Sequence, residues 1–525
     1  MKRNETVNQL TSTHWDVLIV GGGVTGAAIL HQATQQGIKA VLIEQRDFAW
    51  GTSSRSTKWV HGGIKYLTQG YVRLALKAVK ERQHLLADAP GLVDNLELVV
   101  ASYRRDWRSR WITRVGLFVY DIMGGKLRRH HSSARSVIAR NPSLLSTDLS
   151  CGLTIYESVT DDARLVLRVL QEAQAMGARA LNYCCADELI MENNQVKGVV
   201  ATDAVSGKSL DIKAKLVVSA TGAWADKLRQ QVKSNSKKMR PLRGSHLVLA
   251  ADRIDVQDNI VMLHPRDKRN VFIFKWEGRL VTGSTDLDHN GDLNEEPAVT
   301  TEEFDYLMEN LNYHFPAAKL IEKDVIASFS GVRPVINSGA ENPGNESRDH
   351  AIWYEKGLLT VTGGKLSTSR LIAQEVMIKT RELLNLGEYD SASASATMFP
   401  QGVINQENSV LSPAAERRLL GRYGRLASEL VEASHGGELE TIAQTDTLWA
   451  ELRWAAGREQ VEHLDDLMLR RTRLGLLLKN GGQDWLPQIG ALCQPLLGWD
   501  QPRWNQEVDR YLSIWARYYS VPAAV

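Results

Sequence analysis

The chain has 525 residues, which is too long for one ordinary domain and predicts two to four. Hydrophobic residues make up 43% and charged residues 24%, values typical of a globular protein. The 63 Lys and Arg nearly balance the 61 Asp and Glu, so no overall field favours nucleic acid as a partner.

The N-terminal sequence MKRNETVNQLTSTHW lacks the apolar core of a signal peptide, and no apolar run is long enough to span a bilayer. Four cysteines show no metal-ligand spacing, so no metal site is expected. The adjacent pair Cys184 and Cys185 lies in an apolar context that indicates packing in a reducing compartment. We expect a cytoplasmic protein whose membrane contact, if any, is peripheral.

The strongest local signal is a glycine-rich turn near the N-terminus. The run DVLIV is followed by GGGVTG, by the helix-like AAILHQATQQG and by the strand-like KAVLIE. Here Gly21 makes the tight turn, Gly23 lets backbone approach a pyrophosphate, and Gly26 allows close helix–strand packing. Glu44, 18 positions beyond Gly26, is placed to bind ribose hydroxyls and disfavours a 2′-phosphate. The pattern predicts a dinucleotide site.

Later segments distinguish FAD from NAD. Glu44 is followed by the long small-residue loop RDFAWGTSSRSTKWVHGG, where an NAD dehydrogenase usually continues its strand–helix alternation. SATGAWAD and TVTGGKLSTSR are further strand and glycine-turn segments, each of which could also be a simple corner. Corners so far apart in the chain suit one extended cofactor. The glycine pair in KWVHGGIKYL is either a tight turn or a close approach of backbone to a ligand.

Together these segments resemble, in order, those of FAD-dependent sn-glycerol-3-phosphate dehydrogenases, the respiratory, quinone-linked enzymes. The resemblance also includes TDDARLVL, RGSHLVL, TGSTD, SGVRPV, SRDH and LMLRRTRLG, and it extends from about Asp16 to Gly475. It implies an α/β fold with a doubly wound, Rossmann-like FAD-binding domain, a β-rich substrate cap and a C-terminal helical domain. It also implies oxidation of sn-glycerol 3-phosphate to dihydroxyacetone phosphate, with hydride passing to flavin N5 and electrons to a membrane quinone.

The resemblance implies cofactor contacts beyond the first glycine turn. We expect FAD to touch the small-residue loop and both later glycine corners: Thr52, Ser53, Ser54, Thr221, Gly222, Gly363 and Gly364.

A phosphorylated alcohol needs permanent cations in its site, and Arg suits phosphate best. At positions matching the family motifs, Arg333, Arg348 and Lys365 are expected to line the phosphate and reaction pocket. Lys65 and Tyr66 are also expected to face it.

A histidine is a suitable base for the substrate hydroxyl, because its pKa lies near neutrality. His246 and His61 are both candidates, and each could instead be a core histidine. We prefer His246 as the base and place His61 near the flavin, with Lys365 and the arginines stabilising developing charge.

One departure from the family bears on the substrate. Family members commonly read His-Gly-Gly-Leu-Arg-Tyr-Leu, whereas this chain has Lys65 in the Arg position. Lysine keeps the charge but loses the planar fork that binds phosphate with two donors. The alternatives left open are an oxidase that uses oxygen, a dehydrogenase of a related polyol phosphate, and a flavin-binding sensor without catalysis.

Residues 103–131 hold eight Lys and Arg against two Asp, with Trp107 and Trp111 beside a short apolar run. This composition suits the headgroup region of an anionic membrane, although a solvated face of the cap is the alternative. Attachment to the inner face of the cell membrane would deliver electrons to quinone. No recognised nucleic-acid module accompanies the patch, and a homodimer is left open.

The domain boundaries follow from the motifs and from a change in composition after the last glycine corner. Asp161 and Asp162 are expected to cap a helix, and Arg470, Arg471 and Arg473 to pair with acids across a domain interface. We predict a discontinuous FAD-binding domain (14–95, 151–235 and 330–388), a cap (96–150 and 236–329), a linker (389–410) and a helical domain (411–525).

Overall fold

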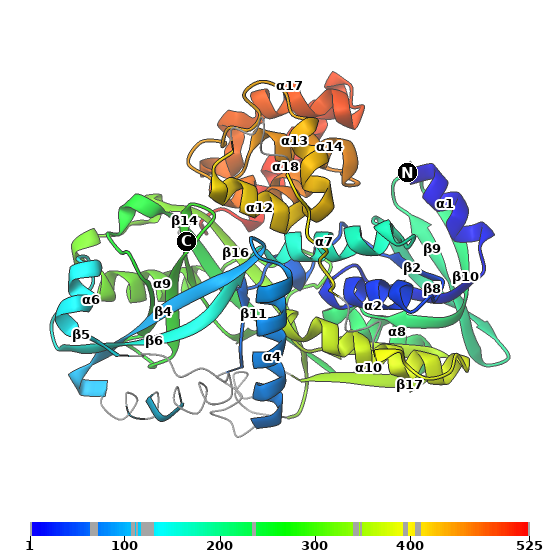
Figure 1. The fold of residues 1–525 in the computed structure, drawn as a ribbon, viewed down its shortest axis with the longest axis horizontal. Helices are drawn as coiled ribbons and strands as arrows, with labels where there is room; N and C mark the ends of the chain where they lie inside the picture. Colours follow the sequence, from blue (N-terminus) through cyan, green and yellow to red (C-terminus); the bar gives the residue numbers. More distant parts are fainter. Residues whose placement is uncertain are drawn as a thin grey trace.

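The structure is a computed structural model that describes residues 3–63, 72–106, 111, 114–116, 131–233, 238–339, 346, 349–391, 397–404 and 411–522. Figure 1 shows two β-rich lobes side by side, with the C-terminal helices above them. Lys65, Tyr66 and Arg348 lie outside the described residues, as does most of 103–131.

The first sheet carries the glycine-rich turn. Within the described residues it has eight strands, with β17, β18, β10, β1, β2 and β7 in that order and β8 and β9 attached to β10. The pairs from β18 to β7 are parallel, whereas β17 is antiparallel to β18. The strands are β1 (Trp15–Val20), β2 (Ala40–Ile43), β7 (Arg179–Leu181), β8 (Cys184–Glu192), β9 (Gln195–Asp203), β10 (Lys208–Ser219), β17 (His350–Glu355) and β18 (Leu358–Gly363).

Helices cover this parallel sheet, as its continuous apolar strands require. Helix α2 (Val24–Gln35) packs between α7 (Asp162–Ala175) and α10 (Ser369–Leu384) (Figure 1). Further helices are α1 (Arg3–Ser12), α4 (Val72–Asp88) and α8 (Ala225–Val232). The expected doubly wound cofactor fold is confirmed.

The second sheet forms the other lobe. Within the described residues it has ten strands: β15, β11, β14, β13, β12, β4, β6 and β3 in order, with β16 paired to β11 and β5 to β6. The strands are β3 (Trp59–Val60), β4 (Val93–Tyr103), β5 (His131–Ser133), β6 (Leu149–Thr160), β11 (Met239–Ala250), β12 (Asn259–Leu263), β13 (Asn270–Trp276), β14 (Arg279–Gly283), β15 (Leu287–Asp288) and β16 (Val325–Ile336). Helices α6 (Ala134–Arg140) and α9 (Thr301–His314) accompany it.

Hydrogen bonding moves four segments relative to the predicted boundaries. Strand β3 and residues 93–95 of β4 fall inside the predicted cofactor range 14–95, yet they pair with β6 in the second sheet. The sequence placed residues 151–160 and 330–336 with the cofactor domain. Strand β6 pairs along its length with β4, and β16 pairs with β11, so both segments belong to the second sheet. The domain division otherwise stays a prediction.

The C-terminal part is helical, as expected. Its helices are α12 (Pro413–Tyr423), α13 (Ala427–Glu432), α14 (Trp449–Arg458), α15 (Leu464–Asp466), α16 (Leu474–Leu477), α17 (Leu486–Leu497) and α18 (Gln501–Tyr518). Ile489 and Trp504 share one buried cluster with Val248 and Phe274 of the second sheet. The helical domain therefore completes the core of the cap rather than standing apart from it.

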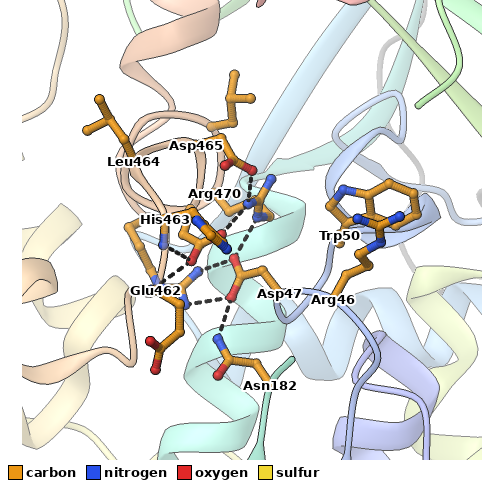
Figure 2. A network of polar contacts seen from close by, with 12 residues as sticks. Arg46, Asp47, Trp50, Asn182, Glu462, His463, Leu464, Asp465 and Arg470 are labelled. Carbon is orange, nitrogen blue, oxygen red and sulfur yellow. Dashed lines mark hydrogen bonds and ion pairs between the residues drawn. The ribbon is translucent and has the colours of Figure 1, made fainter. Parts of the chain in front are cut away.

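Buried ion pairs join the helical domain to the cofactor lobe. Asp47 accepts from Arg470 Nε at 2.5 Å and from Arg471 Nη1 at 2.6 Å, and Asn182 donates to its other oxygen at 3.0 Å. Figure 2 shows Asp47 at the centre of this network, with Asp465 bonded to Arg470. The prediction that these arginines pair with acids across an interface is confirmed. No helix in the described part of the chain is both long enough and apolar enough to cross a membrane.

Candidate active site

A cavity of about 820 Å³ is lined by residues of both sheets. Its walls include the carboxyl ends of β1, β2, β10 and β18 from the first sheet and parts of β11 and β16 from the second. The carboxyl ends of parallel strands are where ligands of open α/β sheets bind. The predicted site residues can therefore be placed relative to this one space.

The glycine turn between β1 and α2 forms one wall of the cavity. Gly21 has a φ of 116°, and a Cβ there would lie 2.5 Å from the carbonyl oxygen of Ala220. Gly23 caps α2 without a side-chain hydrogen bond and lines the cavity. Gly26 does not line it; a Cβ at Gly26 would lie 1.9 Å from the carbonyl oxygen of Gly21. The turn leaves backbone beside the cavity at the positive end of a helix, which suits a pyrophosphate.

Glu44 follows β2 and also lines the cavity. One carboxylate oxygen accepts from the Gly22 amide at 2.6 Å and the other from the Arg46 amide at 2.9 Å. Burial raises the pKa of Glu44, and these two amides oppose the shift. The carboxylate is thus fixed beside the glycine turn, where a ribose hydroxyl would meet it.

The loop of small residues has divided roles. Ser53 lines the cavity and its Oγ accepts from the Val24 amide at 3.0 Å, while Thr52 lines it and donates to the Val332 carbonyl. Ser54 is only 3% exposed and does not line the cavity. Its carbonyl accepts from Lys58 at 2.6 Å and from Arg473 at 3.1 Å. In the structure Ser54 thus contacts neighbouring protein rather than the cavity, and the expected cofactor contact at Ser54 stays a prediction that the cavity lining does not support.

The two later glycine corners reach the same cavity. Thr221 and Gly222 line it after β10, and Gly363 and Gly364 line it after β18. A Cβ at Gly363 would lie 2.5 Å from the carbonyl oxygen of Asp349. Distant parts of the chain thus surround one ligand space, as the sequence predicted for an extended cofactor.

His246, on β11, lines the cavity and is only 1% exposed. Its ring stacks on Phe329 with centroids 4.7 Å apart, and Nε2 lies 3.1 Å from Thr57 Oγ1. Burial, then Arg333 and Lys58, hold the pKa of His246 well below its usual value. A Cβ at Gly283 would lie 2.3 Å from the ring, so glycine makes room for it. The histidine is neutral at pH 7 and able to accept a proton.

Arg333, on β16, lines the cavity from the same side. Nη1 lies 3.1 Å from an oxygen of Asp286, and Nη2 donates to Ser284 Oγ at 3.3 Å. A Cβ at Gly244 would lie 2.1 Å from Nη2. The glycine of the RGSH motif therefore creates the space that the guanidinium occupies.

His61 and Lys365 complete the part of the site that is described. Both line the cavity; the His61 ring lies 5.3 Å from that of Trp59, and Lys365 follows the Gly363–Gly364 corner. Beside His61, the Gly62 amide donates to Glu157 at 2.8 Å, and Gly63 lines the cavity with a φ of 84°. Gly63, the second glycine of the pair, thus brings backbone close to the ligand space, whereas Gly62 is held by Glu157.

Sequence reasoning did not select Thr57, Glu157, Phe272 or Asp286, all of which line the cavity. Thr57 and Asp286 stand inside motifs that carried the resemblance, so position within a motif was the available signal. Glu157 comes from β6, and no pattern in the sequence indicated that this strand reaches the cavity.

Comparisons with known proteins agree with this geometry. A family model described as FAD dependent oxidoreductase matches residues 16–376, and one described as the C-terminal domain of alpha-glycerophosphate oxidase matches 379–504. An aerobic glycerol-3-phosphate dehydrogenase of Staphylococcus aureus is 30% identical over 495 residues, covering 90% of this chain and 89% of that relative. The chain belongs to the FAD-dependent glycerol-3-phosphate dehydrogenase family.

Two solved structures share the fold of this chain. The glycerol-3-phosphate dehydrogenase of Bacillus halodurans, solved in complex with FAD, has a TM-score of 0.77 and 26% identity, and the match covers 98% of this chain and 97% of that one. The L-alpha-glycerophosphate oxidase of Mycoplasma pneumoniae has a TM-score of 0.58 and 19% identity over 72% of this chain and 96% of that one. The second likeness concerns the fold alone.

The family's cofactor, FAD, fits the residues present. The glycines at 21, 23, 363 and 364 line the cavity with backbone alone, and the Glu44 carboxylate lies beside it just after β2. When bound, FAD would be held by this glycine cradle and would supply a hydride acceptor.

Proposed function

We propose that the chain oxidises sn-glycerol 3-phosphate to dihydroxyacetone phosphate with FAD and passes the electrons to a membrane quinone. The proposal rests on one observation: a single cavity brings together the glycine cradle, the neutral His246, and the cations Arg333 and Lys365. The relatives' names supply the substrate and are consistent with this arrangement.

In this proposal each residue has a defined task. Arg333 binds the phosphate, because its planar fork can make two charged hydrogen bonds. The imidazole of His246 takes the proton of the C2 hydroxyl as hydride leaves C2. Lys365 stabilises the negative charge that develops on the oxygen. Arg348, Lys65 and Tyr66 belong to the same proposed pocket by their motifs, and His61 lies near the flavin.

Anaerobic titration tests the reaction. Protein that carries FAD should lose its yellow colour with sn-glycerol 3-phosphate and recover it with a soluble quinone. Colour that persists with this substrate contradicts the enzyme and supports a sensor. Stoichiometric formation of peroxide during aerobic turnover would show that oxygen, rather than quinone, is the electron acceptor.

Lys65 bears on the choice of substrate. We expect glycerol 3-phosphate to have the highest kcat/KM in a panel of polyol phosphates, and Lys65→Arg to lower its KM by restoring a fork. If another polyol phosphate has the highest kcat/KM and Lys65→Arg restores the preference for glycerol 3-phosphate, that other polyol phosphate is the substrate of this chain.

We also propose peripheral attachment to the inner face of the cell membrane through residues 103–131. In the described part of this segment Trp111 and Val115 are 57% and 60% exposed, and Arg114 lies over the Trp111 ring. Exposed apolar side chains beside cations suit an anionic headgroup layer. Trp111→Ser with Val115→Ser should abolish sedimentation with phosphatidylglycerol vesicles, whereas Met191→Ser, which changes another exposed apolar residue, should not. Equal sedimentation of all three proteins contradicts this site.

A further inference from the structure

Residues Ser54–Lys58, here called the clamped segment, separate the C-terminal domain from His246. The Ser54 carbonyl accepts from Arg473, the Arg55 guanidinium bonds the hydroxyl of Tyr519, and Thr57 meets His246. A stretch of five residues thus has protein from the end of the chain on one side and the proposed base on the other.

Arg473 holds the segment through a carboxylate as well as directly. Its guanidinium binds Asp162, and its Nε donates to Asp161 at 2.9 Å. Asp162 in turn accepts from the Ser56 amide at 2.9 Å, from Ser56 Oγ at 2.7 Å and from Lys58 Nζ at 2.9 Å. Arg473 is 1% exposed and has a left-handed φ of 63°. Such a backbone persists only where its surroundings fix it.

Tyr519 holds the segment from the other side. Its hydroxyl accepts from Arg55 Nη2 at 3.0 Å and from Nε at 3.2 Å. Its carbonyl accepts from the Ser328 amide at 2.7 Å, which fastens the chain end to β16. Arg55 also pairs with Glu296 at 2.8 Å, so loss of the tyrosine hydroxyl leaves no unpaired charge.

Two contacts link the clamped segment to His246, so the position of the segment affects the orientation of the ring. Thr57 Oγ1 lies 3.1 Å from Nε2, and among the described residues the buried Nδ1 has no hydrogen-bond partner. Lys58 Nζ lies 4.8 Å from the centroid of Phe329, the ring on which His246 stacks. Thr57 therefore supplies the hydrogen bond that sets the rotation of the imidazole.

We propose that Arg473 and Tyr519 of the C-terminal region are positioning residues for the reaction, which act through the clamped segment and Thr57 to orient His246. The proposal rests on the function given above for His246. The helical domain is then part of the catalytic apparatus although none of its side chains lines the described cavity.

A double-mutant cycle tests the proposal. Each of three single changes should slow flavin bleaching by saturating glycerol 3-phosphate: Tyr519→Phe, Arg473→Lys and Thr57→Val. We expect the rate to fall about tenfold in Arg473→Lys and in Thr57→Val, because a small misplacement of a catalytic group lowers the rate by one to two orders of magnitude. KM should stay near that of the parent, since the proposed phosphate contacts are elsewhere. Combining Thr57→Val with Arg473→Lys should add little, because both changes release the same hydrogen bond.

Controls separate positioning from loss of structure. Reduction of the flavin by dithionite needs no base and should proceed at the parent's rate in every variant. Arg453→Lys changes an arginine that binds Glu438 inside the helical domain, and should leave bleaching unchanged. Thr57→Ser keeps the hydroxyl and should restore most of the rate lost in Thr57→Val. Tyr519→Phe keeps the aromatic ring, so this variant can test the proposal if Arg473→Lys does not fold.

The outcomes are distinct. If the parent bleaches but the two changes multiply in the double variant, Arg473 does not act through Thr57 and the inference is wrong. If only flavin content falls while the bleaching rate of loaded protein is unchanged, the contacts merely support the fold, and the inference is again wrong. If the flavin of the parent protein is never bleached by glycerol 3-phosphate, both the proposed function and this inference are wrong.

Discussion

His246 is surrounded by cations and apolar surface, which is the environment that keeps an imidazole neutral. Burial lowers its pKa first, and Arg333 and Lys58 lower it further. Lys58 itself has a pKa lowered to about 8 by burial, against the opposing effect of Asp162. Both groups owe their charge state to neighbours far away in the sequence.

The first prediction concerns the pH dependence of kcat. A base is active above its pKa, so activity is lost only as pH falls through the depressed pKa of His246. We therefore expect kcat at saturating glycerol 3-phosphate to show no rise centred on the ordinary histidine pKa of about 6.5 between about pH 6 and 7, below the range in which Lys58 titrates. An ascending limb at that pH would show that His246 is not the base or is not shielded.

Arg333 provides the second prediction. Arg333→Lys keeps the charge but cannot bind phosphate with two parallel donors, so KM for glycerol 3-phosphate should rise about 10- to 100-fold, with a smaller change in kcat. Steady-state kinetics with a quinone acceptor measure both constants. Arg140→Lys, which alters an exposed arginine bound to Asp258, is the matched control and should change neither. A KM equal to the parent's would remove Arg333 from the phosphate site.

The sequence predicted the positions of residues well where the local sequence determines the structure, and poorly where contacts with distant segments determine it. Gly21, Gly23 and Glu44 have a strand, turn and helix around them that fix their places. Ser54 has the same local appearance as Ser53, yet it faces Lys58 and Arg473, which arrive from elsewhere. No local pattern contains that information.

At the scale of elements, the β1–α2 turn depends on a contact between two glycines. Gly26 lies in the first turn of α2 with the Gly21 carbonyl against it, so the helix axis can approach the sheet. This closeness places the start of α2 beside the cavity. The glycine is a requirement of packing rather than of ligand contact.

Gly26→Ala should therefore destabilise the protein by about 3 kcal/mol or more and reduce its flavin content, since the new Cβ would meet rigid backbone. Gly457→Ala, inside α14 and with nothing near the added Cβ, should instead stabilise it by about 0.5–1 kcal/mol. Denaturant unfolding and the ratio of flavin to protein measure the two effects. Unfolding midpoints of the same sign for both variants would contradict this account.

Element assignment from sequence succeeded for the glycine corners and for the helix that begins at Asp162. The predicted cap is confirmed, because Asp161 accepts from the Arg164 amide at 3.2 Å. The boundary between the two sheets could not be predicted near residues 151–160. Its strands read alike in sequence, and only pairing with β4 assigns them to the second sheet.

At the scale of the whole molecule, three regions are joined by apolar core and buried charge together. The arginines at 470 and 471 meet Asp47, just beyond Glu44, so the helical domain fastens the loop that follows the ribose-binding acid. Although burial raises the pKa of Asp47, Arg471 and Arg470 hold it below its usual value. This acid therefore stabilises the fold above its unfolded pKa of about 3.9, and the contribution is lost as pH falls through the lower, folded value.

Asp47→Asn should leave the buried Arg471 without its close counterion, whereas Arg470 keeps Asp465 and Asp466, and should lower the free energy of unfolding by about 3 kcal/mol. The helical domain should then become the first region cut by protease, at a lower protease concentration than in the parent. Asp484→Asn, which changes a carboxylate on the exposed side of the helical domain, is the control. Parent-like thermal and proteolytic behaviour in Asp47→Asn would show that the interface is held by apolar contacts alone.

Strand β16 limits where insertions and deletions can be tolerated in this family. Phe329, Gly331 and Arg333 alternate along it, so one face carries the ring beneath His246, the gap for Arg55 and the proposed phosphate ligand. Deleting one residue within this stretch would turn the next side chains to the opposite face and remove them from the site at once. The Asn193–Asn194 turn between β8 and β9 carries no such constraint. Relatives should therefore vary in length at that turn, while the spacing between Ser328 and Arg333 stays constant.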